Sequence, residues 1–288
     1  MDGRHAEFAR LPLIPPLIGN GGLNKLGPIG LNFASGGAGA LSETFAGLVI
    51  NLKEQLRFFK SAVKQLRSDV GRKAANKLVC NAVYLFNIGA NDYFFPLSSN
   101  STLFTSHTPE EYASMVVGNF TQVIVEIYRR GGRKFGIVNQ APLGCIPGLR
   151  AANLSAGGNG GCLEVATGLA QIHNALLSQT LQYLQQELPG FKYSLFDFFN
   201  ASLQVLADPS AFGFKEVKSA CCGSGPLNGE FSCGGRRGIS QFELCDNPSD
   251  HLFFDSDHPT EAANWLIAKL MWAGPLDIVS PYNLQALF

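Results

Sequence analysis

The sequence predicts an α/β fold, in which a mostly parallel β-sheet is covered by helices on both faces. Three observations predict it: short apolar runs typical of buried strands, longer segments in which apolar residues recur at helical spacing, and the alternation of the two along the chain. Parallel neighbours need long crossovers, so such alternation is typical of a covered parallel sheet. No internal repeat or low-complexity linker divides the chain, and we expect one domain over residues 1–288.

The first predicted helix and strand lie before residue 90. From Leu52 to Val70, apolar residues recur four and three positions apart, which places them on one helix face. Residues 82–88 form a continuous apolar run that Gly89 closes. A run of this kind predicts a buried parallel strand.

The next helix carries start and stop signals. Thr108 can cap its first turn, Pro109 suits the first helical position, and Glu111 completes a capping box. Gly131 and Gly132 can end it. We therefore expect a helix from Pro109 to about Gly131.

The second half repeats the alternation. Strands are predicted at residues 134–138 and 192–196, with a helix over 165–188 between them. A Cys- and Gly-rich loop follows, then the apolar run 252–254, and a last helix begins near Thr260. Functional sites of such sheets form at the carboxyl ends of the strands, which is where the polar motifs considered below fall.

Composition excludes several functional classes. Apolar residues make up 46% of the chain and charged residues 15%, which favours a packed core over disorder. Lys+Arg and Asp+Glu number 22 each, so no basic excess supports a nucleic-acid or anionic-membrane partner. No apolar stretch is long enough to predict a membrane span, and the N-terminus does not resemble a signal peptide. Nothing in the sequence indicates an oligomeric state.

The cysteines indicate an oxidising compartment. Six of the seven lie at or after Cys145, in segments rich in glycine, and are expected to form disulfides, although their pairing stays open among fifteen connectivities. Zinc is the competing interpretation, but the spacing of cysteine and histidine does not fit a zinc site. Cys80 is expected on a buried strand and unpaired.

Four N-glycosylation sequons point in the same direction. They begin at Asn100, Asn119, Asn153 and Asn200. Together with the cysteines they predict a secreted glycoprotein whose leader is absent from this chain.

Asp255 and His258 form the strongest single chemical motif. A carboxylate three residues before a histidine can orient the imidazole, which then takes a proton from a nucleophile. Two alternatives remain open at this point. The pair can be a surface contact before a helix, or Asp255, Asp257 and His258, with His251, can supply metal ligands.

Two further segments can supply donors to a developing oxyanion. Residues 30–39 are rich in glycine, and a glycine such as Gly36 lets a backbone N–H approach a ligand closely. Asn91 follows the first predicted strand on a strand-to-loop turn and can donate its side-chain amide. The alternatives are a plain turn for the first segment and a turn-capping asparagine for the second.

In this order, three segments resemble the GDSL-type esterases/lipases of plants, within the SGNH hydrolase superfamily. The matching residues are Gly-Leu-Asn-Phe-Ala-Ser-Gly-Gly-Ala-Gly at 30–39, Phe-Asn-Ile-Gly-Ala-Asn-Asp-Tyr at 86–93 and Asp-Ser-Asp-His-Pro-Thr-Glu-Ala-Ala-Asn at 255–264. Residues 141–147 and 220–223 also look like family segments. The resemblance covers nearly the whole chain.

The resemblance implies a flavodoxin-like three-layer sandwich and a carboxylic ester hydrolase that acts on lipid or other acyl esters without metal or organic cofactor. By motif, Asp255 and His258 match the acid and base of a Ser-His-Asp mechanism. Gly36 and Asn91 match the oxyanion-hole residues.

The nucleophile is not identified in this chain. The family carries its serine in a Gly-Asp-Ser segment after the first strand, and this chain contains no Gly-Asp-Ser. We therefore expect that the chain is truncated at its N-terminus, lacks the first strand and is inactive as given. The alternatives are a catalytically inactive ester- or glycan-binding relative and an incomplete gene model. Ser35 is a poor replacement, since its loop matches the oxyanion segment.

Overall fold

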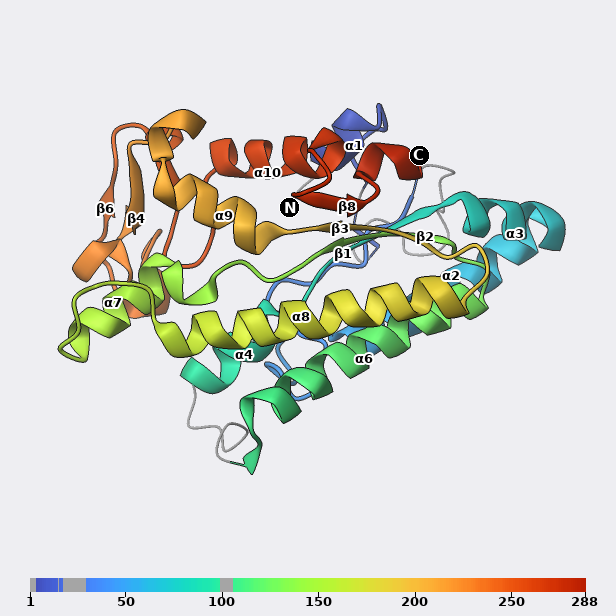
Figure 1. Ribbon diagram of the computed structural model, residues 1–288, viewed down its shortest axis with the longest axis horizontal. Coiled ribbons are helices and arrows are strands. Elements are labelled where there is room, and N and C mark those ends of the chain that lie inside the picture. Colours follow the sequence, from blue (N-terminus) through green and yellow to red (C-terminus); the bar gives the residue numbers. More distant parts are fainter. Residues whose placement is uncertain (1–3, 15, 18–29, 99–105) are drawn as a thin grey trace. The chain divides into compact units, whose positions relative to one another are not determined.

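The computed structural model describes residues 4–14, 16–17, 30–98 and 106–288 (Figure 1). The chain divides into two compact units. Unit 1 takes its residues from Met1–Asn139, Ile172–Phe196 and Trp272–Phe288, and unit 2 comprises Gln140–Gln171 and Asp197–Met271. That the chain forms a single hydrolase domain stays a prediction.

Unit 1 is built on a four-stranded sheet in the order β1-β2-β3-β8. Strands β1 (Val83–Asn87), β2 (Lys134–Val138) and β3 (Lys192–Phe196) run parallel, and β8 (Val279–Pro281) adds an antiparallel edge. The predicted α/β fold with a mostly parallel sheet is confirmed. The strand β8 has no signal in the sequence analysis, because its three residues are too few for an alternating pattern.

Helices cover this sheet. They are α1 (Arg4–Phe8), α2 (Leu52–Val70), α3 (Arg72–Asn81), α4 (Ala90–Ser98), α6 (Pro109–Arg129), α8 (Glu164–Glu187) and the 3₁₀ helix η7 (Leu284–Leu287). The first eight residues of α8 belong to unit 2. In Figure 1, α6 and α8 run along the same side of the strands.

Aromatic side chains fill the interface between the sheet and its helices. On β1, Tyr84 packs edge-on against Phe59 of α2, and Phe86 packs against Phe120 of α6. On the opposite face of the sheet, Leu284 of η7 packs directly over Gly136. A Cβ at Gly136 would lie only 2.8 Å from the Leu284 side chain. The alternation of side chains along each strand therefore divides the sheet into an aromatic face and a face that η7 contacts.

Strand β1 differs from the prediction in its burial. It spans Val83–Asn87 within the predicted run 82–88, but it is not buried: Leu85 is 42% exposed and Asn87 is also exposed. Among the described residues, β1 ends the sheet, so one of its edges faces no neighbouring strand. An apolar run alone cannot report how many neighbours a strand has, which is why the prediction was wrong on this point.

The prediction for Cys80 was half wrong. The residue is unpaired, as expected, but it lies in the last turn of helix α3 and is exposed. The apolar residues before Gly89 give no sign of the boundary between helix and strand. Helix α3 ends at Asn81, and β1 begins two residues later.

The predicted capping box at the start of α6 is confirmed. Thr108 Oγ1 accepts the N–H of Glu111, and the Glu111 carboxylate accepts the N–H of Thr108. The helix ends at Arg129, and Gly131 follows with a φ of +113°, a conformation that favours glycine.

The strands of unit 2 form two pairs, in contrast to the four-stranded sheet of unit 1. It contains α7 (Pro147–Ser155), α9 (Phe198–Ala207), most of α10 (Glu261–Ala273), the parallel pair β4 (Glu216–Ala220) with β7 (His251–Phe253), and the antiparallel pair β5 (Cys222–Gly223) with β6 (Glu243–Leu244). Short 3₁₀ helices lie at Leu143–Cys145, Pro209–Phe212, Pro226–Asn228, Arg236–Gly238 and Pro248–Asp250. One apolar cluster of this unit joins Val205, Phe214, Val217 and Ala263.

Three disulfides hold the loops of unit 2. They join Cys145 to Cys162, Cys221 to Cys245, and Cys222 to Cys233. The expectation that the six downstream cysteines form disulfides is confirmed, and the structure selects one of the fifteen connectivities. All three bonds lie in unit 2.

Candidate functional site

The glycine-rich loop presents an unused backbone donor. Gly36 is exposed, and a Cβ built on it would meet no heavy atom within 4 Å. Its N–H donates no hydrogen bond to another residue that the structure describes. An N–H in open space is what an oxyanion requires of a backbone donor.

Ser35 has a structural partner. Its Oγ accepts the backbone N–H of Ile50 at 3.1 Å and so closes the loop that begins at Gly36. The Ser35 hydroxyl therefore stabilises this turn, which agrees with the low ranking of Ser35 as a nucleophile.

Asn91 lies in the first turn of α4, directly after β1, rather than on the predicted strand-to-loop turn. Its Nδ2 donates a hydrogen bond to the carbonyl of Ala38 at 3.1 Å. One amide N–H is used in this contact, so the other remains for a ligand. The structure thus brings together the two segments predicted to supply oxyanion donors, Gly36 to Ala38 and Asn91.

Asp92 is a residue that the sequence analysis did not single out. Its buried carboxylate accepts the N–H of Ala40 at 2.8 Å through Oδ2, and the N–H of Leu41 at 3.0 Å through Oδ1. The Thr44 hydroxyl also donates to Oδ1, at 2.6 Å. A Cβ at Gly39 would lie 2.3 Å from Oδ1, so glycine is required where the loop meets the carboxylate. The adjacency of Asp92 to Asn91 was visible in the sequence, but its partners lie about fifty residues away.

Burial has the largest effect on the electrostatics of Asp92. It raises the pKa of the carboxyl group, and the donors from Thr44, Leu41 and Ala40 oppose this rise without cancelling it. The backbone around Asp92 is also fixed, because the Tyr112 hydroxyl donates to the Asp92 carbonyl at 2.6 Å.

The next residue extends these contacts to α8. The Tyr93 Oη lies 2.8 Å from Nδ1 of His173, and both side chains are buried. Burial lowers the pKa of His173 to about 3, so this imidazole is neutral at physiological pH. The Tyr93–His173 contact is therefore a neutral hydrogen bond that anchors the first turn of α4.

Asp255 and His258 lie in the turn that follows β7 in unit 2. His258 Nδ1 lies 2.9 Å from Oδ1 and 3.1 Å from Oδ2 of Asp255. Oδ1 also accepts the backbone N–H groups of Asp257 and His258, at 2.9 and 2.8 Å. The carboxylate thus fixes both the turn and the imidazole. The His258 side chain is 67% exposed, and its Nε2 has no partner among the described residues.

The hydrogen bond from Asp255 raises the pKa of His258 above its ordinary value; partial burial opposes this rise, and Asp257 adds a smaller upward effect. Burial would raise the pKa of Asp255, but the hydrogen bonds from His258 and from the Asp257 N–H lower it below its ordinary value. At neutral pH this arrangement gives an ionised Asp255 beside an imidazole of increased basicity.

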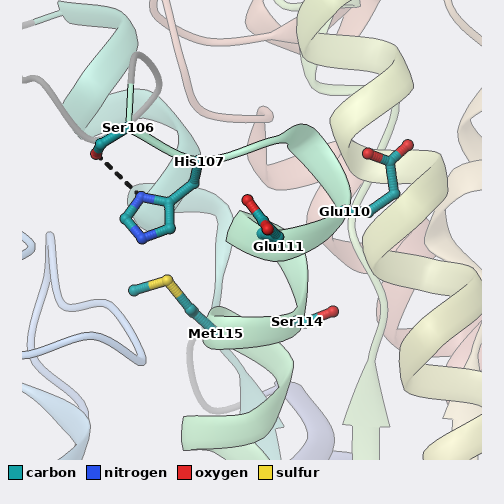
Figure 2. Close-up of a pocket in the computed structure, with 6 residues that line it drawn as sticks. All are labelled: Ser106, His107, Glu110, Glu111, Ser114 and Met115. Carbon is teal, nitrogen blue, oxygen red and sulfur yellow. Dashed lines mark hydrogen bonds between the residues drawn. The ribbon is translucent and has the colours of Figure 1, made fainter.

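A hollow at the start of α6 holds none of the predicted site residues. Figure 2 shows it lined by Ser106, His107, Glu110, Glu111, Ser114 and Met115. Ser106 Oγ lies 3.1 Å from His107 Nδ1, which could suggest a catalytic pair. We assign no such role, because the Glu111 carboxylate is engaged in the capping box instead of orienting the histidine.

The alternative of a metal site at Asp255, Asp257, His258 and His251 is not supported by a set of ligands among the described residues. Among the described residues, the group close enough to hold an ion is Cys221, Cys245 and His251, and its two cysteines are bonded to each other. The sulfur of a disulfide is not the thiolate that a metal binds.

The sequons have different surroundings. Asn119 on α6 and Asn200 on α9 are exposed, and their Nδ2 atoms donate to the Met115 carbonyl and the Asp197 carboxylate, whereas the Asn153 Oδ1 accepts a hydrogen bond from the Gly160 N–H. Asn100 lies outside the described residues. In the part of the chain that the structure describes, no helix has the length and apolar character needed to cross a membrane.

Comparison with known proteins gives the chain a family. Residues 3–271 match the family described as GDSL-like Lipase/Acylhydrolase. Over 284 residues the chain is 50% identical to GDSL esterase/lipase 1 of Arabidopsis thaliana, covering 98% of this chain and 75% of the relative. It is 48% identical over 285 residues to GDSL esterase/lipase 2 of the same plant, with 98% and 75% covered. Against a GDSL lipase of Tanacetum cinerariifolium it is 43% identical over 283 residues, covering 98% and 73%. The chain therefore belongs to the GDSL-like lipase/acylhydrolase family, and its family chemistry is the hydrolysis of carboxylic esters.

Proposed function

We propose that His258 is the general base of this ester hydrolase and that Asp255 orients it. The observation that carries the proposal is the pair of contacts from His258 Nδ1 to the Asp255 carboxylate, at 2.9 and 3.1 Å. This bond engages Nδ1 and directs Nε2 away from the turn. A neutral imidazole held in this way can take a proton at Nε2.

Gly36 and Asn91 supply the oxyanion hole in this proposal. The Gly36 N–H and the second N–H of the Asn91 amide have no partner among the described residues, and the Ala38 carbonyl holds Asn91 against the glycine loop. Two donors on one carbonyl oxygen would stabilise the negative charge that develops when the carbonyl carbon is attacked.

The reaction then follows from these roles. A serine hydroxyl attacks the ester carbonyl carbon while His258 Nε2 takes its proton, and the carbonyl electrons move to the oxygen that Gly36 and Asn91 hold. Collapse of this intermediate expels the alcohol, which receives the proton from His258. Water, activated by the same base, then releases the carboxylic acid. The serine is not assigned to a residue of this chain, because no Gly-Asp-Ser occurs in it.

The substrate is proposed to be a lipid or another small acyl ester, and the protein to be secreted. Three disulfides and two exposed sequons, at Asn119 and Asn200, support an oxidising, extracellular setting. The balance of 22 basic and 22 acidic residues gives no support to nucleic acid as a partner.

The first experiment assays the chain as given on p-nitrophenyl butyrate, with Asp255→Ala/His258→Ala as its control. We expect no turnover above the control. Substantial turnover by the unaltered chain would show that a nucleophile within these 288 residues has been overlooked.

The second experiment tests the base directly. The N-terminal Gly-Asp-Ser segment of a family member is fused to the chain, and turnover of the same ester is measured. We expect activity that His258→Ala abolishes and that Asn91→Ala lowers by about 10²–10³-fold in kcat. Activity that survives His258→Ala would refute the proposed base. A folded but inactive fusion would favour the alternative of an ester-binding relative.

A further inference from the structure

Asp92 is the only buried carboxylate among the described residues. A buried charge is costly unless other groups compensate for it. Here the compensation comes from two backbone N–H groups and one hydroxyl, all from the segment that follows the glycine loop. The proposed mechanism gives Asp92 no proton to move, so its burial needs another explanation.

The hydrogen bonds of Asp92 lie just after the glycine loop of residues 30–39. The N–H groups of Ala40 and Leu41 are consecutive, and they converge on the two oxygens of one carboxylate. Successive N–H groups that converge in this way form an anion-binding concavity, which Asp92 fills from within the protein. Thr44 adds a third donor, and Gly39, which has no Cβ, leaves the room that the carboxylate needs beside the loop.

Two successive residues of α4 therefore hold the same loop. Asn91 donates to Ala38, and Asp92 accepts from Ala40 and Leu41. The first contact uses part of the amide that is proposed to bind the oxyanion. The second contact lies on the other side of Gly39, where Ala40 and Leu41 follow Gly36 by four and five residues along the chain.

The first turn of α4 is the fixed partner in this arrangement. The Tyr112 hydroxyl of α6 donates to the Asp92 carbonyl, and Tyr93 contacts the buried His173 of α8. Each of these side chains is at most 1% exposed. The helix turn is thus anchored independently of the loop, so Asp92 holds the loop against a rigid support.

We infer that Asp92 is a positioning residue, which holds the Gly36 N–H at the distance from the Asn91 amide that lets both donate to one oxygen. The inference rests on the oxyanion roles proposed for Gly36 and Asn91. Such a site needs its donors placed to within about 0.5 Å, a tolerance that an unsupported glycine loop cannot meet.

The test uses the full chain and sodium butyrate, whose carboxylate oxygen resembles the oxyanion in charge. Nitrogen and proton chemical shifts of the Gly36 backbone amide and the Asn91 side-chain amide are followed during the titration. In the unaltered chain we expect both signals to shift. In Asp92→Asn we expect the dissociation constant at these two amides to rise about tenfold, as for loss of one charge-assisted hydrogen bond.

Hydrogen exchange supplies a second measurement on the same variant. An asparagine can present its oxygen at only one of the two positions that the Asp92 oxygens occupy, so either Ala40 or Leu41 loses its acceptor. We expect exchange of at least one of these two N–H groups to become about tenfold faster, with strand β2 unchanged.

Two further variants act as controls. Glu43→Gln makes the same charge change at an exposed position of the same segment, and we expect it to leave both measurements unchanged. Thr44→Val removes only the hydroxyl donor to Asp92, and a loss of butyrate affinity of about threefold is expected. If Asp92→Asn does not fold, Thr44→Val decides the question.

Two results would overturn the inference, and they are distinguishable. If the unaltered chain responds to butyrate and Asp92→Asn binds it equally well, with only the exchange accelerated, Asp92 has a purely structural role. If the two amides of the unaltered chain do not respond to butyrate, the oxyanion roles of Gly36 and Asn91 fail, and the positioning role fails with them.

Discussion

The two units of the protein are stabilised in different ways. Unit 1 contains the four-stranded sheet and a continuous aromatic interface, and its one described cysteine, Cys80, is unpaired. The described strands of unit 2 form two-stranded pairs and no larger sheet, and this unit holds all three disulfides. Disulfides cross-link the unit whose strands form only short pairs, whereas the unit with the larger covered sheet is stabilised by its core.

The same difference appears in two carboxylates, one from each unit. Asp255 of unit 2 makes all its contacts within three residues of itself, and both backbone N–H groups donate to the same oxygen. Asp92 of unit 1 makes contacts about fifty residues away, and the N–H groups of Ala40 and Leu41 donate to different oxygens. A local motif can be read from sequence, and a distant contact cannot.

The largest expected difference between the units follows reduction of the disulfides. With excess dithiothreitol we expect unit 2 to lose hydrogen-exchange protection at β4 and β7, because each native disulfide typically contributes about 2–4 kcal/mol. Protection of β2 and β3 in unit 1 should persist. The measurement is exchange followed by mass spectrometry in the oxidised and reduced states.

The matched control for reduction is Cys80→Ser. Because Cys80 forms no disulfide, the variant should show the same protection as the unaltered chain in both states. Equal loss of protection in β2 and β4 on reduction would contradict the expectation that the disulfides stabilise unit 2 and not unit 1.

The second comparison replaces each carboxylate by an amide. Asp92→Asn should lower the free energy of unfolding by about 1–3 kcal/mol, because one buried N–H loses its acceptor. Asp255→Asn should cost less than about 1 kcal/mol, because the remaining oxygen can still accept both backbone N–H groups and the partner histidine is exposed. Urea unfolding measures both, and equal costs would show that burial does not separate the two sites.

Two glycines of unit 1 are expected to differ in how well they tolerate a side chain. Gly39→Ala should lower the free energy of unfolding by about 1–3 kcal/mol, since its Cβ would lie 2.3 Å from the Asp92 Oδ1. Gly36→Ala should have little effect on stability, because nothing lies within 4 Å of its Cβ. Thermal unfolding of the two variants is the measurement. A larger loss of stability in Gly36→Ala than in Gly39→Ala would contradict the surroundings described for these two glycines.

The smallest effects concern the titration of His258. Asp255→Asn should lower the pKa of His258, and Asp257→Asn should lower it less, because the Asp255 hydrogen bond is the larger cause of the raised value. Since the folded pKa exceeds the unfolded value of about 6.5, this interaction stabilises the fold below that pH and is lost as pH rises through the folded pKa.

NMR titration of the His258 ring signals measures both shifts. Asp250→Asn is the control, because that carboxylate pairs with Lys215 and should leave the His258 titration unchanged. An unchanged pKa in Asp257→Asn would remove the contribution assigned to Asp257.

Much of the fold could be predicted where the local signal is strong. The predicted strands at 134–138 and 192–196 have the observed bounds, and the Thr108–Glu111 capping box forms as expected. These elements have short-range causes: an apolar run between polar ends, and side chains that satisfy backbone N–H groups three residues away. The Asp255–His258 contact is of the same kind, since it joins residues three apart.

Other features could not be predicted because they depend on neighbours that are distant in sequence. The exposure of Leu85 reflects the position of β1 at the end of the sheet. The helical placement of Asn91 depends on the anchoring of α4, which brings the amide to Ala38. The disulfide connectivity likewise depends on which loops meet, and six cysteines at given spacings leave it open.

The sequence by itself determined the fold class and the family chemistry of this protein, and it predicted the contact between Asp255 and His258. Those features are encoded in periodicity, in motifs and in contacts between near neighbours. Only the tertiary structure revealed that Asp92 binds the segment after the glycine loop and that the disulfides are confined to unit 2. The physical reason is that burial and hydrogen bonding are satisfied in space, so a carboxylate can find its partners fifty residues away as readily as three.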